Sequence, residues 1–455
     1  MPAADETTPG LETSLTSQWL ICVSCGTQYP TTSRSRQKTC FICDDPRHYT
    51  PAAGQSFTTM AALRASGHRN IFMPYEPSYP GPMSPPSPTT SVASSVVDSG
   101  SSPTLPPSDL LINRRHPMAQ ARPDSWKRLG VSSSSIHNNP KAKRLSPQPP
   151  KQERYHPHGA MISIVTKPIF AMGQRAILVR KCLANRRRIA YAQTTYKRDD
   201  TSRKAGLGPG HRQHVLTQIQ TFLTDTPAGN ILWDCITLLD DDTVERIRAL
   251  GGLAAIVISH PHFYTAHAEW AAAFGCPVFL AAEDRKWVAL EIPLHVFLGN
   301  SKTDQITRRS HEIIIEGVRS GFIAVKLGGH FPGSMVGHFN GRLLISDTLL
   351  TTPAGLGGWE ADAAGIARSR PPGINTFAFM WSGPNSIPLS VEDISRIWEV
   401  LKRYEFKSTH GAFLGEDIED AAGIKRRVLE SIQIQIRRMG WTYNPLLTES
   451  APPQI

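Results

Sequence analysis

The sequence predicts an α+β fold, an αββα sandwich in which two sheets lie face to face with helices outside them. Strands with helices between them occur twice in order along the C-terminal part of the 455-residue chain. Residues 311–347 alternate strand and turn, as an antiparallel sheet does. Such a succession suits two sheets packed on each other. Two Cys-x-x-Cys pairs near the N-terminus predict a small unit in front of the sandwich.

The small unit covers residues 18–50, here called the four-cysteine segment. Cys22-x-x-Cys25-Gly26 and, after fourteen intervening residues, Cys40-x-x-Cys43 have the spacing of a zinc ribbon. Four thiolates around one Zn²⁺ can fold a segment that is too short for a core of its own. We therefore expect a structural zinc at Cys22, Cys25, Cys40 and Cys43. The alternative is two incidental thiol pairs, and a protein partner is a candidate to dock on this segment.

Two stretches of unusual composition interrupt the chain. Residues 74–159 hold seventeen of the 37 prolines, and we predict a disordered linker or insertion, because such a segment buries too little apolar surface to offset its ordering entropy. Residues 181–225 are strongly basic and aperiodic. The two stretches carry net charges of +5 and +6, which account for the whole +11 of the chain. The remaining residues carry no net charge, so nucleic-acid binding by the folded body has no support.

The sandwich is expected over residues 160–440. Residues 173–180 and 231–235 are apolar strands that would form a hairpin, so 181–225 is an insertion in a hairpin loop or a retained intron. Asp240 or Asp241 caps a helix that runs to about Leu250. Further helices are expected over residues 265–274, 391–405 and 418–438.

Metal-ligand residues follow the predicted strands. Ile256-Val257-Ile258-Ser259 delivers His260-Pro261-His262 to the edge of a sheet, where a loop can direct both imidazoles at one ion. His330 follows Gly328-Gly329, Asp347 follows the strand Leu343-Leu344-Ile345, and His410 precedes Gly411.

In order and spacing this series resembles the metallo-β-lactamase superfamily, in a fungal type with a zinc-ribbon-like N-terminal segment. The resemblance implies that His260, His262 and His330 bind the first metal. It implies that Asp347 is the bridging carboxylate and that His410 is the last histidine of a second site.

The chain departs from the superfamily at that second site. Tyr264 occupies the position of the metal-binding aspartate, and Thr265 occupies that of the neighbouring histidine. His267 comes two residues too late, inside the predicted helix. We therefore expect a single metal, Zn²⁺ or Fe, held by three histidines with one open position, unless His267 swings back to complete a weak second site.

This arrangement predicts a metal-dependent hydrolase that activates water for an unidentified small-molecule substrate. Asp347 is the candidate to take the proton, and Tyr264 is the candidate to stabilise an oxyanion, because a phenol is a poor base at neutral pH. Two alternatives stay open. One is a mononuclear iron oxygenase that uses His260, His330 and Asp347. The other is a non-catalytic scaffold with a decayed site, in which the zinc ribbon is the working part.

The sequence also carries expectations about location. It shows no charged segment followed by an apolar one at its N-terminus, and no run of about 18 apolar residues. With cysteines used for metal, we expect an intracellular protein, cytoplasmic or nuclear, that does not span a membrane.

Overall fold

The structure, a computed structural model, describes residues 15–75, 161–180, 229–299, 309–359 and 361–452. The predicted insertion 181–225 lies outside the described residues, as does the predicted linker 74–159 apart from its first two residues. One compact unit contains all the described residues. No helix among them is long and apolar enough to cross a membrane.

A three-stranded antiparallel sheet carries the first cysteine pair. Its order is β2-β1-β3, with β1 at Leu20–Cys22, β2 at Gln28–Tyr29 and β3 at Phe57–Thr59. The 3₁₀ helix η2 (Leu15–Gln18) precedes it, and helix α1 (Met60–Ala65) follows with Thr59 as its N-cap. The turn after β1 places Gly26 at φ +80, in the left-handed region that glycine accepts without strain.

A seven-stranded sheet follows in the order β10-β9-β8-β7-β6-β5-β4. Its strands are β4 (Arg69–Pro74), β5 (Met161–Lys167), β6 (Arg175–Val179), β7 (Asn230–Trp233), β8 (Leu253–Val257), β9 (Val278–Ala281) and β10 (His295–Leu298). β4 to β7 pair antiparallel, and β7 to β10 pair parallel. The sheet thus begins with residues 69–74, before the boundary predicted at residue 160, because β4 pairs along its whole length with β5.

The second large sheet has six strands in the order β11-β12-β13-β14-β19-β20. They are β11 (Ser310–Ile315), β12 (Val318–Lys326), β13 (Met335–Phe339), β14 (Arg342–Leu344), β19 (Ser408–His410) and β20 (Asp417–Glu419). β14 and β19 pair parallel, and the other neighbours pair antiparallel. Since β14 and β19 are parallel, the residues that follow them lie at the same edge of the sheet.

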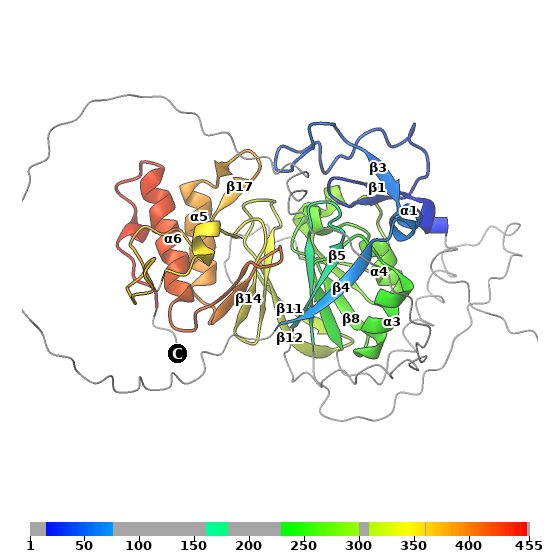
Figure 1. The fold of residues 1–455 in the computed structure, drawn as a ribbon. Coiled ribbons are helices and arrows are strands. Elements are labelled where there is room, and N and C mark those ends of the chain that lie inside the picture. The colour runs from blue at the N-terminus through cyan, green and yellow to red at the C-terminus, as the bar shows by residue number, and fades with distance from the viewer. Residues whose placement is uncertain (1–14, 76–160, 181–228, 300–308, 360, 453–455) are drawn as a thin grey trace, which may run out of the picture. The chain divides into compact units, whose positions relative to one another are not determined.

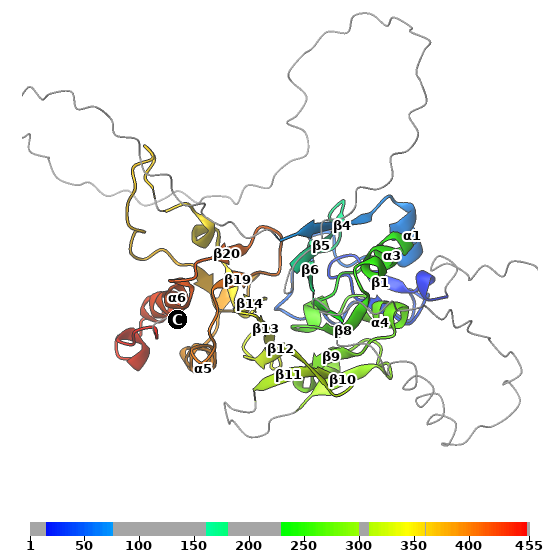
Figure 2. The same cartoon turned by 90° about the horizontal axis from the view of Figure 1, so that it is seen from below.

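Helices follow the strands of both large sheets (Figures 1 and 2). They are α3 (Asp241–Ala249), α4 (His267–Phe274), α5 (Val391–Leu401) and α6 (Ile424–Arg438), with short 3₁₀ helices η4 (Pro261–Phe263), η5 (Ala282–Trp287), η7 (Pro353–Leu356) and η8 (Pro445–Leu447). Asp240 caps α3 as expected, its carboxylate accepting from Thr243 N. α6 begins at residue 424 rather than about 418, because β20 occupies residues 417–419.

Two short antiparallel pairs complete the described structure. β15 (Leu350–Thr351) pairs with β16 (Phe377–Ala378), and β17 (Met380–Ser382) pairs with β18 (Ile387–Pro388).

Three buried apolar clusters explain how the layers hold together. One contains side chains from both large sheets, for example Trp233 and Val257 with Phe322 and Leu344. A second joins the other face of the seven-stranded sheet to α3, α4 and the four-cysteine segment. The third joins the six-stranded sheet to α5 and α6. Mixed sheets with helices confirm the α+β class, and burial of the shared clusters is the main force that favours this packing.

Candidate metal centres

Four predicted ligands come together at the edge where β8 and β14 end. His260 and His262 follow β8 and flank the start of η4, and Asp347 follows β14. His330 lies in the loop between β12 and β13. One ligand atom from each lies within 4.8 Å of the others. These four residues are called the histidine centre below.

The donor atoms of the histidine centre are spaced as ligands of one ion. Asp347 Oδ2 lies 3.2 Å from His260 Nε2, 3.2 Å from His262 Nδ1 and 3.6 Å from His330 Nε2. His330 Nε2 lies 3.2 Å from His262 Nδ1. A tetrahedral zinc with bonds of about 2.0–2.1 Å has ligand–ligand edges of about 3.3–3.4 Å. The four residues therefore fit one tetrahedral metal.

For His260 and His330, hydrogen bonds at the second ring nitrogen fix which nitrogen faces the centre. His330 Nδ1 donates to the carbonyl of Trp381 at 2.8 Å, which leaves Nε2 as the ligand atom. His260 Nδ1 lies 2.9 Å from Ser259 Oγ and 3.3 Å from Ser346 Oγ. Metal-binding histidines have such partners on their second nitrogen, because these fix the tautomer and the ring orientation.

Burial and charge favour the protonation states that a metal requires. Burial lowers the pKa of His262 well below its usual value and that of His330 to about 4. Both rings are therefore neutral, and each has a nitrogen lone pair for a metal. Burial alone would raise the pKa of Asp347, but His260 and the hydrogen bonds from His260 and His262 hold it well below its usual range. The three histidine side chains are 1–2 % exposed, and that of Asp347 is 16 % exposed. The centre is thus reached from the Asp347 side.

Glycine makes the His330 loop possible. Gly329 has φ +86, and a Cβ there would lie 2.7 Å from Leu389 Cδ1. A side chain at this position would therefore meet both backbone strain and a steric clash. Thr348 Oγ1 closes the loop by donating to Gly328 O at 2.9 Å. The loop that carries His330 is packed directly against the residue that follows Asp347.

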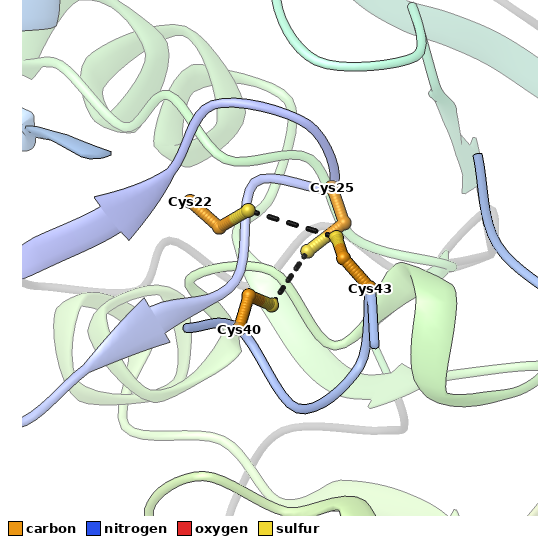
Figure 3. A group of neighbouring side chains, drawn as sticks. All are labelled: Cys22, Cys25, Cys40 and Cys43. Carbon is orange, nitrogen blue, oxygen red and sulfur yellow. Dashed lines mark hydrogen bonds between the residues drawn. The ribbon is translucent and has the colours of Figure 1, made fainter. Parts of the chain in front are cut away.

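The four predicted cysteines also come together (Figure 3). The sulfurs of Cys22 and Cys43 lie 3.6 Å apart, as do those of Cys25 and Cys40. A zinc with Zn–S bonds of about 2.3 Å has edges of about 3.8 Å, so the cluster fits one tetrahedral ion. All four side chains are buried, and Tyr29 donates to Cys40 Sγ at 3.0 Å.

Three other residues predicted for the metal sites lie apart from the histidine centre. His410 bonds through Nδ1 to Asp417 and through Nε2 to Ser408, both at 2.9 Å. The hydroxyl of Tyr264, which is 1 % exposed, lies 3.5 Å from Asp284 O. His267 opens α4 and uses both ring nitrogens, on Tyr264 O at 2.7 Å and on His295 Nε2 at 2.8 Å. The roles predicted for His410 and Tyr264 stay predictions.

Comparisons with known proteins give one sequence relative and several structural neighbours. No family model matches the sequence. The uncharacterized protein YmaE of Bacillus subtilis (strain 168) is 33% identical over 184 residues, which are 40% of this chain and 58% of YmaE. The match thus spans less than two thirds of that relative's length.

Two of the similar solved structures are a metallo-β-lactamase and a protein of the metallo-β-lactamase superfamily. A B3 metallo-β-lactamase with an active-site glutamic acid has 12% identity and a TM-score of 0.31, over 61% of this chain and 87% of its own. The superfamily protein ST1585 from Sulfolobus tokodaii has 11% identity and a TM-score of 0.27, over 47% of this chain and 77% of its own.

The structure adds two residues that the sequence analysis missed, Arg47 and His48. Both belong to the four-cysteine segment, far from the histidine centre in sequence. Arg47 Nη1 donates to His330 O at 3.0 Å, and the His48 ring centroid lies 4.5 Å from that of His262. The one sequence signal for Arg47 and His48 is that they follow Cys43 by four and five residues. That spacing does not indicate which surface they contact.

Proposed function

We propose that this chain is a metal-dependent hydrolase of the metallo-β-lactamase superfamily, with the αββα sandwich of that type. The observation that carries the proposal is the spacing of the four donor atoms of the histidine centre, 3.2–3.6 Å for the pairs described above. Lysine or arginine paired with a carboxylate would indicate a structural ion pair, whereas three imidazoles around one carboxylate are a metal-ligand set.

Zinc bound at this centre would lower the pKa of a bound water toward 7 and so supply hydroxide at neutral pH. The protein's own contribution is to fix the ligands and to hold that water. Asp347 Oδ1 is buried and has no hydrogen-bond partner among the described residues, whereas Oδ2 faces the three histidines. Oδ1 is therefore the atom we assign to accept a hydrogen bond from the water and orient it. Tyr264 would have to leave its contact with Asp284 O to serve the same centre.

The four-cysteine cluster takes a second, structural zinc in this proposal. Its support is the tetrahedral spacing of four buried sulfurs. Four buried thiolates close this site to substrate, whereas a water at the histidine centre would bind as a fifth ligand, on the side of the partly exposed Asp347. The expected content of the purified chain is thus two metals.

Metal analysis of the purified chain tests both sites. Wild type should hold about two zinc ions, the His260→Ala/His262→Ala variant one, and the Cys22→Ser/Cys25→Ser variant should lose the other. His338→Ala is the matched control, because His338 contacts Glu405 O and lies outside both groups. Loss of metal in the cysteine variant alone would overturn the hydrolase proposal and favour the non-catalytic scaffold.

Hydrolysis is tested with the zinc-loaded chain against representative phosphodiesters, thioesters, lactones and β-lactams. The fold does not choose among these classes, because unrelated chemistries are built on one fold. We expect wild type and His338→Ala to cleave one of these classes. The His260→Ala/His262→Ala variant should cleave none of them. Zinc at the centre with no cleavage of any class would contradict the proposed activity.

A mononuclear iron oxygenase is the second candidate. It is favoured by the position of Asp347 Oδ2, which lies within 3.6 Å of a ligand nitrogen of each histidine, so that two histidines and a carboxylate can form a facial triad. Iron in the chain purified from iron-supplemented cells, with oxygen consumption that His330→Ala abolishes, would support it. Zinc alone, with no oxygen consumption, would exclude it.

A further inference from the structure

The four-cysteine segment touches the histidine centre through the residues directly after Cys43. Arg47 Nη1 donates to the carbonyl of His330 at 3.0 Å. The same guanidinium lies 3.9 Å from the ring centroid of Phe331. Asp45 holds it in place through two hydrogen bonds, accepting from Arg47 Nε at 2.6 Å and from Arg47 Nη2. A bidentate pair fixes an arginine side chain in one orientation. Arg47 therefore holds the His330 loop in place through its hydrogen bond to His330 O.

A neighbouring carbonyl ties the same turn to the other side of that loop. Pro46 O accepts from Ser382 Oγ at 2.8 Å and from Asn385 Nδ2. One residue before Ser382, Trp381 O accepts the Nδ1 proton of His330. His330 is thus held by the four-cysteine segment twice, directly through Arg47 and indirectly through the 381–385 turn.

His48 faces the second ligand. Its ring is edge-on to that of His262, with centroids 4.5 Å apart and planes at 84°. His48 Nδ1 donates to Tyr49 O at 2.6 Å, because a carbonyl can only accept. Nε2 then carries the lone pair, and it is buried with no partner among the described residues. The ring therefore has the same arrangement as His330, whose Nδ1 is also bonded to a carbonyl.

A third connection reaches the backbone of the His-x-His segment. Gln174 Nε2 donates to Cys25 O at 2.9 Å and to His262 O at 3.1 Å. Gln28 N donates to Thr265 O at 3.0 Å. These contacts join the first cysteine turn to the loop that carries His262, whereas Arg47 and His48 join the second cysteine turn to His330 and His262.

We propose that the four-cysteine segment is a structural part of the histidine centre, with Arg47 and His48 as positioning residues for the metal held there. Metal at the four cysteines fixes the 45–48 turn, and the turn fixes His330 and His262. Loss of that metal therefore lowers the affinity of the histidine centre. The coupling is reciprocal, since each metal must raise the affinity for the other by the same factor. This inference rests on the proposed metal at the histidine centre.

Cobalt titration of the metal-free full chain separates the two sites without an activity assay. Co²⁺ at four thiolates gives intense sulfur-to-metal charge-transfer bands, whereas Co²⁺ at nitrogen and oxygen ligands gives weak d–d bands alone. Arg47→Met and His48→Asn should weaken binding at the histidine centre by about 10- to 100-fold and leave the thiolate bands unchanged. The asparagine side chain of the His48→Asn variant retains a donor for Tyr49 O but lacks the Nε2 lone pair.

Matched variants separate positioning from general damage. Arg34 lies in the same segment, over the Phe57 ring, and bonds to carbonyls of its own loop. Arg34→Met should leave both affinities unchanged. Arg47→Lys and His48→Gln should restore part of the lost affinity, because each returns a polar atom near the missing one. Cys22→Ser/Cys25→Ser should weaken the histidine centre as well.

The outcomes distinguish this inference from the proposed function. Cobalt at the histidine centre with an affinity unchanged in Arg47→Met and His48→Asn would overturn the inference and leave the function standing. Binding of a single cobalt ion by wild type at every cobalt concentration, with thiolate charge-transfer bands, would overturn the proposed function, and the inference with it.

Discussion

The side-chain amide of Gln174, the residue directly before β6, donates to the backbone carbonyl of His262 at 3.1 Å. The same nitrogen donates to Cys25 O at 2.9 Å. Gln174 is 4 % exposed, so both carbonyls depend on this amide rather than on solvent. One buried side chain thus ties a metal-ligand segment to a cysteine turn.

Replacement of Gln174 by Met should therefore affect both stability and metal binding. Two carbonyls lose a buried donor, which costs about 1–3 kcal/mol of unfolding free energy. Urea unfolding measures that loss, and cobalt titration should show weaker binding at the histidine centre. Gln433→Met is the matched control, because Gln433 Nε2 also bridges two carbonyls, those of Leu446 and Glu449, away from the metal sites. Equal metal affinities in the two variants would contradict this role for Gln174.

Asp417 should make the fold sensitive to acid. Burial alone would raise its pKa, but hydrogen bonds from His410 and Arg175 outweigh burial and lower the pKa from 3.8 to about 2. The folded-state pKa is the lower one, so the carboxylate stabilises the fold above about pH 4, and this contribution is lost as the pH falls toward 2. Asp417→Asn should remove about 2 kcal/mol at pH 7 and flatten the stability profile between pH 4 and pH 2.

Unfolding free energies of wild type and Asp417→Asn across that pH range provide the measurement. Asp362→Asn is the control, because Asp362 accepts from Ala364 N and Ile366 N in a surface turn, and asparagine can accept the same bonds. A wild-type profile that stays flat between pH 4 and pH 2 would argue against the Asp417 contribution.

The resemblance implies that His410 is a metal ligand, whereas the structure leaves it outside the histidine centre. Both of its ring nitrogens are bonded, to Asp417 and to Ser408. We expect His410→Gln to keep the metal content of wild type, whereas His330→Gln loses one ion. Metal analysis after dialysis is the measurement. Loss of an ion in His410→Gln would restore the predicted role of His410 as a ligand of a second metal position.

Gly337 tests the packing between the two sheets. A Cβ at this position would lie 2.6 Å from Phe322 Cζ and 3.1 Å from Trp233 Cε3. Both neighbours belong to the cluster shared by the sheets, so the sheets must separate locally or the rings must shift. Gly337→Ala should lower the unfolding free energy by about 1–3 kcal/mol. Gly358→Ala, with open space around its Cβ, should not change it, and thermal unfolding compares the two.

Much of the ligand set of the histidine centre could be predicted from the sequence. His260 and His262 follow one apolar strand, and Asp347 follows another, so hydrophobic patterning places them at sheet edges. The cap of α3 at Asp240 followed from local chemistry in the same way. The positions of His410 and Tyr264 could not be derived similarly, because their contacts with Asp417 and Asp284 depend on packing between separate elements.

The sequence by itself determined the α+β class, the two groups of candidate metal ligands and the strands that carry most of them. These are local properties, set by side-chain period and by the spacing of cysteines and histidines. Only the tertiary structure decided that β4 joins the main sheet, that Arg47 and His48 lie against His330 and His262, and that Gln174 bridges both clusters. Those contacts join residues up to 283 positions apart, and no local pattern encodes which distant surfaces will be buried together.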